Sequence, residues 1–381
     1  MKFQKKKIVV AMSGGVDSSV SAALLAREGH EVIGVTMRLL PPCQESAGCC
    51  GAPEDVLVAK RCAEKAGIPH YVLDYSVDFD QHVIRPFIDS YLKGETPNPC
   101  LACNQFIKFE KLKAFAHSLG ATHLATGHYA RIIETTGGDK PFFQLFEAVD
   151  STKDQSYVLY TLGQSELSSM MFPLGENPKT KVRELAKEFG LPNADKKDSQ
   201  EICFIPDNDY GRFLMSRFTE SGVPLPRTLQ PGPIKNERGD VVGEHKGIAY
   251  YTVGQRKGLV LKTQHPHYVT RLEPDTNTLV VGRNDEGQAA GLLAEALHWI
   301  AGAAPQPGEN LLVKIRYKHE PVEASLRIEN EKAVVHFKTP EKAVTPGQAA
   351  VFYRWDEFVK ARAVLGGGTI IKAIRGTPHA L

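Results

Sequence analysis

The sequence predicts an α/β protein in which a Rossmann-like parallel sheet is followed by a small central domain and a C-terminal β-barrel. Three observations carry this prediction. Short apolar runs alternate with helical patterns in the first half, a proline- and glycine-rich segment interrupts them, and short alternating strands follow. A chain of 381 residues is also too long for one ordinary domain. We therefore expect domains at residues 1–208, 209–283 and 284–381.

The first half reads as alternating strands and helices. Residues 8–12 are a continuous apolar run, typical of a strand buried on both faces. Val20, Leu24 and Leu25 then recur at helical spacing before Gly29, which fits a helix C-terminal cap. Further strands are expected at 32–37, 70–74 and 123–126, and helices at 54–66 and 109–119. Ligands bind at the carboxyl ends of parallel strands, so the segments after the first, second and fourth strands should converge on one crevice.

The second half has a different character. Residues 221–258 are rich in proline and glycine with short polar turns, and the helix–strand alternation is lost there. Short alternating strands are expected at 311–316, 323–328, 333–337 and 349–353. These strands predict a small barrel or sandwich at the C-terminus.

Composition limits the class of protein. The chain has 46 basic and 44 acidic residues, a net charge of +2, so a polyanionic partner would have to be recognised by local patches. No apolar run approaches the length of a membrane span, and the N-terminal run is too short for a signal peptide. We expect a cytoplasmic protein without a membrane partner.

The strongest motif is SGGVDSS at residues 13–19, between a predicted strand and a helix. Two glycines allow a tight turn and close approach of the backbone to a ligand, and a helix N-terminus favours an anion. No Gly-Lys-Ser/Thr follows, so the loop is not a Walker A loop. Asp17 is unusual at an anion site unless a cation intervenes, which predicts Mg²⁺ beside phosphates.

Seven cysteines are too few for a disulfide scaffold, and in a reducing compartment they indicate chemistry or metal binding. Cys100 and Cys103 lie in TPNPCLACN, where a Cys-x-x-Cys pair before a helix can acidify one thiol. Cys203 lies far along the chain in SQEICFI.

The other cysteines carry weaker signals. Cys62 falls in a predicted helix and is expected in the core. Cys43, Cys49 and Cys50 share one loop, and a zinc site with Cys100 and Cys103 is conceivable but lacks two separated Cys-x-x-Cys pairs. These three cysteines have no assigned role.

The phosphate loop resembles that of the ATP pyrophosphatase (PP-loop) family, whose members transfer AMP to a carbonyl or amide oxygen. The remaining motifs narrow the resemblance: TPNPxxxCN, ATGHY at 125–129, KDQSY at 153–157, SQEICFI and TVGQRKGL at 252–259 occur in this order. Together they closely resemble the bacterial tRNA-specific 2-thiouridylases over essentially the whole chain.

The resemblance implies that ATP converts the C2 oxygen of the tRNA wobble uridine into an adenylate, a better leaving group. The ATP-binding residues that it implies are Ala11, Met12, Ser13, Gly14, Gly15, Val16, Asp17, Ser18, Met37 and Gly127. Cys203 matches the cysteine that receives a persulfide from an upstream sulfur-carrier protein. Cys103 matches the partner that attacks this persulfide and leaves a Cys103–Cys203 disulfide.

The resemblance also implies that residues 1–208 form the catalytic domain and that the domains at 209–283 and 284–381 bind tRNA. The uridine of the anticodon stem-loop must be flipped out to reach the adenylate. Asn98, Pro99 and Cys100 match the target-base contact. The tRNA contacts that it implies are His128, Lys153, Asp154, Gln155, Arg316, Tyr317 and Gln348. Lysine and arginine suit phosphates, and a tyrosine offers a stacking face for a splayed base.

One residue departs from the family pattern and leaves two sulfur chemistries open. Many members carry an aspartate, proposed as an acid/base, where this chain has Cys100. Cys100, Cys103 and Cys203 could instead hold a [4Fe–4S] cluster whose open iron binds hydrosulfide. Two other readings remain: another adenylating synthetase, which needs neither Cys103 nor Cys203, and a non-catalytic RNA-binding thiol sensor.

Overall fold

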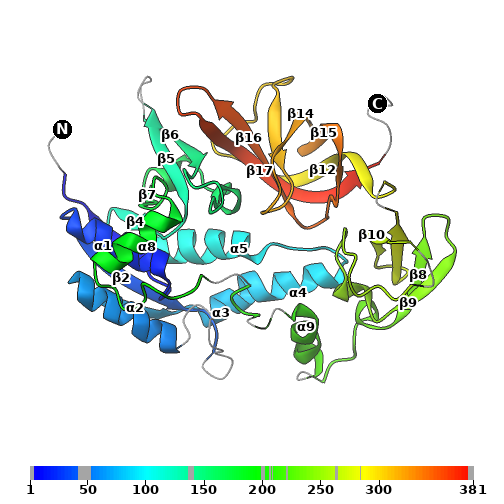
Figure 1. Cartoon of the computed structure of the whole chain (residues 1–381), viewed down its shortest axis with the longest axis horizontal. Coiled ribbons are helices and arrows are strands. Elements are labelled where there is room, and N and C mark those ends of the chain that lie inside the picture. Colours follow the sequence, from blue (N-terminus) through cyan, green and yellow to red (C-terminus); the bar gives the residue numbers. More distant parts are fainter. Residues whose placement is uncertain are drawn as a thin grey trace.

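The computed structural model describes residues 4–41, 53–135, 141–198, 202–205, 207, 209–219, 222–261, 265–283 and 285–375. Cys43, Cys49 and Cys50 lie outside these residues, so their role stays open. Figure 1 shows an N-terminal α/β part, a C-terminal barrel beside it, and a small β part that β10, β9 and β8 form at the opposite end. In the described ranges no helix is long and apolar enough to cross a membrane.

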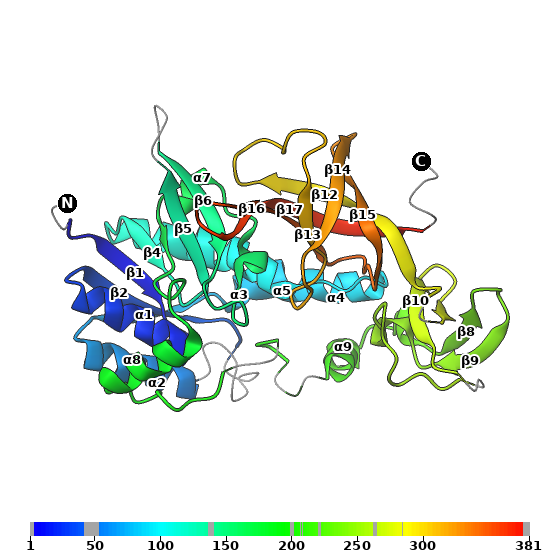
Figure 2. The ribbon, with the colours of Figure 1, turned by 45° about the horizontal axis from the view of Figure 1, so that its top comes forward.

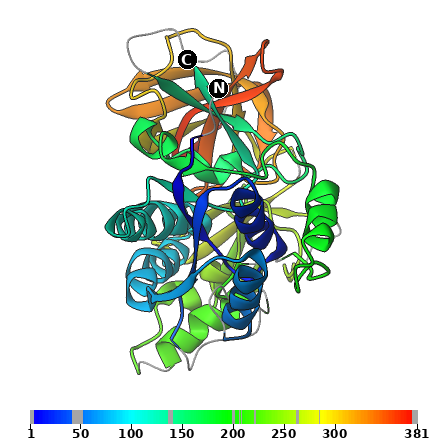
Figure 3. The same ribbon diagram turned by 90° about the vertical axis from the view of Figure 1, so that its left-hand side faces the viewer.

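The N-terminal part is built on a parallel sheet, which confirms the predicted Rossmann-like fold. Its strand order is β3-β2-β1-β4-β7. The central strand of the sheet is β1, in which Ile8, Val9 and Val10 are fully buried. The strands are β1 (Lys7–Ala11), β2 (Glu31–Arg38), β3 (His70–Asp74), β4 (His123–Ala125) and β7 (Met170–Met171). Helices α1 (Val16–Arg27), α2 (Pro53–Ala66) and α8 (Lys179–Glu188) pack beside it, as the end-on view in Figure 3 shows. The chain continues from β1 to β2 on one side and reaches β4 on the other, so the topological switch point lies between β1 and β4.

A long helical connection between β3 and β4 runs toward the central domain (Figure 1). It comprises α3 (Ser76–Phe79), α4 (Arg85–Leu92), α5 (Pro99–Ala102), the π-helical segment η3 (Cys103–Leu112) and α6 (Lys113–Ser118). The predicted helix at 109–119 is therefore only the end of a longer one. Its early part was missed because a π-helical turn does not repeat apolar residues at the α-helical spacing.

The central part contains a four-stranded sheet in the order β10-β11-β8-β9, preceded by α9 (Tyr210–Thr219). The strands are β8 (Gly232–Asn236), β9 (Val241–His245), β10 (Tyr268–Glu273) and β11 (Thr278–Gly282). Their small core gathers around Ile234, Ile248, Tyr251 and Val281. Such a core is compatible with the many turns that the sequence predicts here.

Within residues 285–375, six strands close into the predicted barrel, because β12 pairs with both β15 and β17. They are β12 (Gln288–Trp299), β13 (Leu311–Lys314), β14 (Val322–Glu329), β15 (Lys332–Lys342), β16 (Ala349–Asp356) and β17 (Ala361–Ile374). A hairpin from the N-terminal part, β5 (Ala130–Thr135) and β6 (Phe142–Glu147), joins the barrel sheet through β17. Figure 2 shows this hairpin beside β16 and β17, so the first and last parts of the chain share one sheet.

Candidate functional site

The phosphate loop turns tightly between β1 and α1. Gly14 has a φ of +75°, and a Cβ there would lie 2.5 Å from the carbonyl oxygen of Asp55, so only glycine fits. The Ser18 hydroxyl accepts a hydrogen bond from the Ser13 N–H at 3.1 Å and donates one to the Gly15 carbonyl at 3.1 Å. The loop is therefore held in shape by its own serine before any ligand binds.

The loop meets the ends of β2 and β4 at one edge of the sheet, as the strand order predicts. A Cβ on Gly127, just after β4, would lie 2.7 Å from the backbone nitrogen of Ser18. Met37 is half-buried at the end of β2. Ala11 and Met12 are 8% and 2% exposed, so their side chains belong to the core and only their backbone could face a nucleotide.

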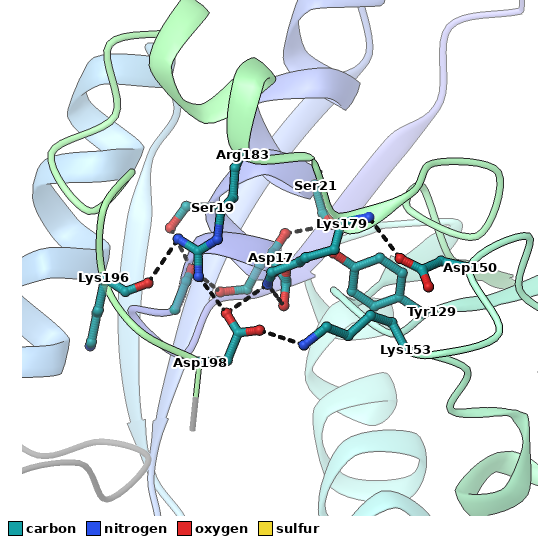
Figure 4. A network of polar contacts seen from close by, with 12 residues as sticks. Asp17, Ser19, Ser21, Tyr129, Asp150, Lys153, Lys179, Arg183, Lys196 and Asp198 are labelled. Atoms are coloured by element: carbon teal, nitrogen blue, oxygen red, sulfur yellow. Dashed lines mark hydrogen bonds and ion pairs between the residues drawn. The ribbon is translucent and has the colours of Figure 1, made fainter. Parts of the chain in front are cut away.

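Asp17 is held by a lysine that the sequence analysis did not select. The Nζ atom of Lys179 lies 2.7 and 2.8 Å from the two carboxylate oxygens of Asp17. The Tyr129 hydroxyl donates to the same carboxylate at 2.8 Å (Figure 4). Because both oxygens are already engaged by donors, Asp17 does not fit a Mg²⁺ ligand in this arrangement. The predicted Mg²⁺ role of Asp17 would require Lys179 to move.

Asp198 is the centre of a cation cluster at the same place. Lys153, Lys179 and Arg183 each approach its carboxylate to 2.8 Å (Figure 4). Burial alone would raise the pKa of Asp198, but the hydrogen bonds from Lys153 and Lys179 lower it to about 2. Lys179 thus bridges Asp198 to Asp17, and the cluster joins the phosphate loop to the segment that precedes Cys203.

We expect Asp198→Asn to lower the free energy of unfolding by roughly 1–2 kcal/mol at pH 7, because an ionised carboxylate among three cations is lost. A depressed folded-state pKa stabilises the fold above the unfolded-state value near 4 and loses this effect as pH falls toward 2. The gap between variant and wild type should therefore shrink between about pH 5 and pH 3 in urea titrations. Asp195→Asn is the matched control, since its exposed pair with Lys187 should contribute little. A gap that stays constant with pH would contradict this account.

Two further side chains, those of Asn193 and Lys196, form hydrogen bonds with the backbone of the phosphate loop. The Asn193 amide donates to the Gly14 carbonyl at 3.1 Å and to the Ser19 hydroxyl at 3.0 Å. Lys196 donates to the same Gly14 carbonyl at 3.2 Å and pairs with Asp55. The segment after α8 thus fixes the loop backbone at Gly14, while Gly127 approaches it at Ser18.

The sequence carries one signal for this cluster. Lysine at the start of a helix is unfavourable for the helix dipole, and α8 begins with Lys179 and has no acidic residue in its first turn. A cation in that place indicates an anionic partner in the tertiary structure. Tyr129 ends the ATGHY motif and Asp198 directly precedes SQEICFI, but nothing in their spacing indicates that they share a site with Asp17.

The predicted base-contact loop is held by the barrel. The Thr96 N–H donates to the Pro346 carbonyl at 2.8 Å, and the Gln348 amide donates to the Thr96 carbonyl at 2.7 Å. The Asn98 side chain accepts from the Cys100 N–H at 3.1 Å and caps the helix that begins at Pro99. Gln348 therefore positions the segment from which Asn98, Pro99 and Cys100 project.

Tyr317 and Arg316 lie near this loop on the barrel. Burial, together with the nearby charges of Asp154 and Cys100, raises the pKa of Tyr317 to about 12, which places both groups in its surroundings. The guanidinium of Arg316 donates to the carbonyls of Lys342 and Ala343 at 3.4 and 3.5 Å. The structure thus gathers Cys100, Tyr317 and Gln348, which are far apart in sequence.

Three residues implied as tRNA contacts are engaged inside the protein. His128 is 8% exposed, and burial together with Lys108 lowers its pKa well below the usual value. Asp154 is 6% exposed and accepts from Ala148 and Ser156, while the Gln155 side chain accepts from the Tyr129 N–H at 3.0 Å. His128 and Asp154 are therefore buried in this conformation, which favours roles in shaping the site, whereas Gln155 is half-buried and its implied tRNA contact stays a prediction.

The two cysteines of the implied redox pair pack against one apolar cluster. Cys103 is buried in the cluster that includes Phe87 and Phe204, and half-buried Cys203 packs against the same cluster. Cys100, by contrast, is exposed. Among the residues that the structure describes, no three or more His, Cys, Asp or Glu side chains are arranged to hold a metal ion. The three cysteines therefore do not fit an iron–sulfur cluster in this conformation.

Comparison with known proteins identifies the family. Residues 6–207 match the tRNA methyl transferase HUP domain, 226–283 the tRNA methyl transferase PRC-barrel domain, and 289–370 the aminomethyltransferase beta-barrel domain. The tRNA-specific 2-thiouridylase MnmA of Carboxydothermus hydrogenoformans is 46% identical over 378 residues, which cover 97% of this chain and 99% of that protein. MnmA of Geobacter metallireducens is 47% identical over 97% of this chain and 98% of its own. The chain belongs to the family of tRNA-specific 2-thiouridylases.

Proposed function

We propose that the protein is a tRNA-uridine 2-sulfurtransferase that uses ATP to replace the C2 oxygen of the wobble uridine with sulfur. The observation that carries the proposal is the packing of Cys103 and Cys203, 100 residues apart, against one apolar cluster in a chain that also has the phosphate loop. Another adenylating synthetase would need the loop but not this pair. A binding protein would need neither the pair nor a loop braced by Lys179.

The proposed reaction has two stages. In the first, the C2 oxygen of uridine attacks the α-phosphorus of ATP and pyrophosphate leaves, with Lys179 and the loop near the phosphate chain. In the second, the sulfane sulfur of a Cys203 persulfide forms a bond to C2, and AMP leaves with the former oxygen. Cys103 attacks the Cys203 sulfur and breaks the persulfide bond, and the resulting disulfide is reduced by two electrons from an external thiol. An upstream sulfur-carrier protein would supply the persulfide, and Mg²⁺ would accompany the phosphates of ATP.

Residues of the N-terminal domain and of the barrel have separate proposed roles in this reaction. The loop at Ser13–Ser18 and Gly127 would bind ATP, with the backbone amides at the N-terminus of α1 facing the phosphates. Asn98, Pro99 and Cys100 would contact the target base, and Gln348 would hold their loop. The ring of Tyr317 would stack on the flipped base. Arg316 and Lys153 would bind phosphates of the RNA, and Lys153 would first have to leave Asp198.

The test is direct. Purified protein is incubated with ATP, Mg²⁺, a sulfide source and an anticodon stem-loop, and the uridine is analysed by mass spectrometry. Replacement of one oxygen by sulfur adds about 16 daltons to the nucleoside, together with release of AMP and pyrophosphate. An unchanged uridine mass with continued AMP release would indicate a different acceptor and overturn the proposal.

Cys100 separates the persulfide route from a cluster route. We expect Cys100→Asp to keep thiolation within about threefold of wild type, because the persulfide route needs only Cys103 and Cys203 as thiols. A route through three thiolates would lose activity on the same change. Cys103→Asp is the matched control and should be inactive under both routes. Rates of 2-thiouridine formation under anaerobic conditions, with the iron content of each sample, give the measurement.

A further inference from the structure

A loop in the central domain carries a sequence motif to which the proposed function gives no role. Residues 252–258, here called the junction loop, follow η6 (Ile248–Tyr250) and include Arg256 and Lys257. The Gln255 side chain accepts from the Thr252 N–H at 3.0 Å and donates to the Lys257 carbonyl at 2.9 Å. Backbone bonds link Gly254 and Gln255 to Val269 at 2.7 and 2.9 Å. The loop is therefore braced at both ends and presents a defined shape.

The junction loop lies where the three domains meet. The hydroxyl of Thr252 is 3.4 Å from that of Thr96, two residues before Asn98. On the barrel side, a Cβ on Gly254 would lie 2.6 Å from the Cβ of Ala343, whose carbonyl accepts from Arg316. One end of the loop therefore touches both the base-contact segment and the strand region that holds Arg316. Figures 1 and 2 both show the right-hand end of α4 meeting the central domain there.

Unpaired cations gather around this junction. Arg256 and Lys257 are exposed, and neither forms an ion pair with any residue that the structure describes. The same holds, for partners in the described ranges, of the exposed residues Lys93 after α4 and Lys318 and Lys342 on the barrel. Two acidic residues also stand here, Glu95 beside Gly347 and the exposed Glu320 close to Lys318 in sequence, so these cations outnumber the anions although the net charge of the whole chain is only +2.

We propose that Arg256 and Lys257 bind phosphates of the RNA strand next to the flipped uridine. The proposal rests on the proposed function, since it takes the RNA at the base-contact loop as given. A nucleotide turned out of its stack must have its flanking backbone held, and rigidly presented cations beside the base pocket do this at little entropic cost. Arg316 and the junction loop then contact the backbone from two domains. The contacts are independent of base identity, and the loop contributes affinity and register.

The experiment compares Arg256→Gln, Lys257→Gln and the double variant with wild type. Arg238→Gln is the matched control, because Arg238 is exposed in the same domain on the turn between β8 and β9, away from the junction. Binding of an anticodon stem-loop is followed by fluorescence anisotropy over a series of salt concentrations. We expect the Kd to rise about threefold for each single change and about tenfold for the double near 0.1 M salt, with the slope of log Kd against log salt falling by about 0.7–0.9 per cation.

The controls separate the possible failures. ATP affinity and thermal unfolding should stay at wild-type values in all variants, since the loop contacts neither the phosphate loop nor a core. A double variant with wild-type RNA affinity and salt slope would overturn the inference. It would also be overturned by a double variant that binds RNA normally but accepts sulfur poorly from a carrier protein, which would make the loop a protein-binding surface. If wild-type protein itself bound no anticodon stem-loop, the proposed function would fail.

Discussion

Replacing Cys203 with serine should reduce 2-thiouridine formation at least a thousandfold, while ATP binding and pyrophosphate exchange continue. Serine cannot carry a persulfide, so the second stage of the proposed reaction has no sulfur to transfer. The first stage depends on the phosphate loop, whereas Cys203 packs against the apolar cluster that includes Phe87 and Phe204. Mass spectrometry of the uridine measures the second stage, and exchange of labelled pyrophosphate into ATP measures the first.

The control for this prediction is Cys62→Ala. Cys62 is 1% exposed, packs behind the phosphate loop on α2, and has its thiol pKa raised by burial, so it should be unreactive. Its loss should lower stability by about 1 kcal/mol without loss of thiolation. Thiolation by Cys203→Ser at a rate near wild type would show that free sulfide attacks the adenylate directly and would remove Cys203 from the mechanism.

The parallel sheet could be predicted because β1, β2 and β4 are short, apolar and mostly buried, a pattern that differs from the spacing of an amphipathic helix. The edge strand β3 is partly exposed and was predicted from its apolar residues between turns. The predicted strand at 70–74 coincides with β3, and those at 32–37 and 123–126 differ from β2 and β4 only at their ends. By contrast, β7 has two residues, and β6 pairs with β17, which lies more than 200 residues further along the chain. Pairing over such a distance leaves no local signal in the sequence.

Some residues of the candidate site could be predicted from the sequence and others could not. Residues on the loop and on TPNPxxxCN could be predicted because their function is written in contiguous motifs that hold glycine, proline and cysteine at fixed spacing. Lys179, Arg183 and Asp198 form the electrostatic centre of the site but come from a helix and a loop without such a motif. Conversely, His128 lies in ATGHY and Asp154 in KDQSY, yet both side chains are buried. Sequence matching transfers a residue's importance but not whether its side chain reaches solvent.

Replacing Lys179 with methionine should lower ATP–pyrophosphate exchange at least a hundredfold. Lys179 is the cation shared by Asp17 and Asp198 at 2.7–2.8 Å, and its side chain is 11% exposed. Its loss leaves two carboxylates close together at the place where the phosphate chain would bind, so an anionic ligand is repelled and a positive contact to the departing pyrophosphate is lost. The variant should also lose about 1–3 kcal/mol of stability, because Asp17 keeps only the Tyr129 hydroxyl as a partner.

A double variant separates the structural effect from the effect on ATP. Asp17→Asn together with Lys179→Met removes one charge of each sign, so most of the lost stability should return while exchange stays low. Lys187→Met on the same helix is the matched control, since its pair with Asp195 is exposed and spans 3.5 Å, and both stability and exchange should be unchanged. If the double variant regained exchange along with stability, Lys179 would serve only to neutralise Asp17. In that case the positive charge for the phosphate chain would have to come from Lys153 and Arg183, which Asp198 already holds beside it.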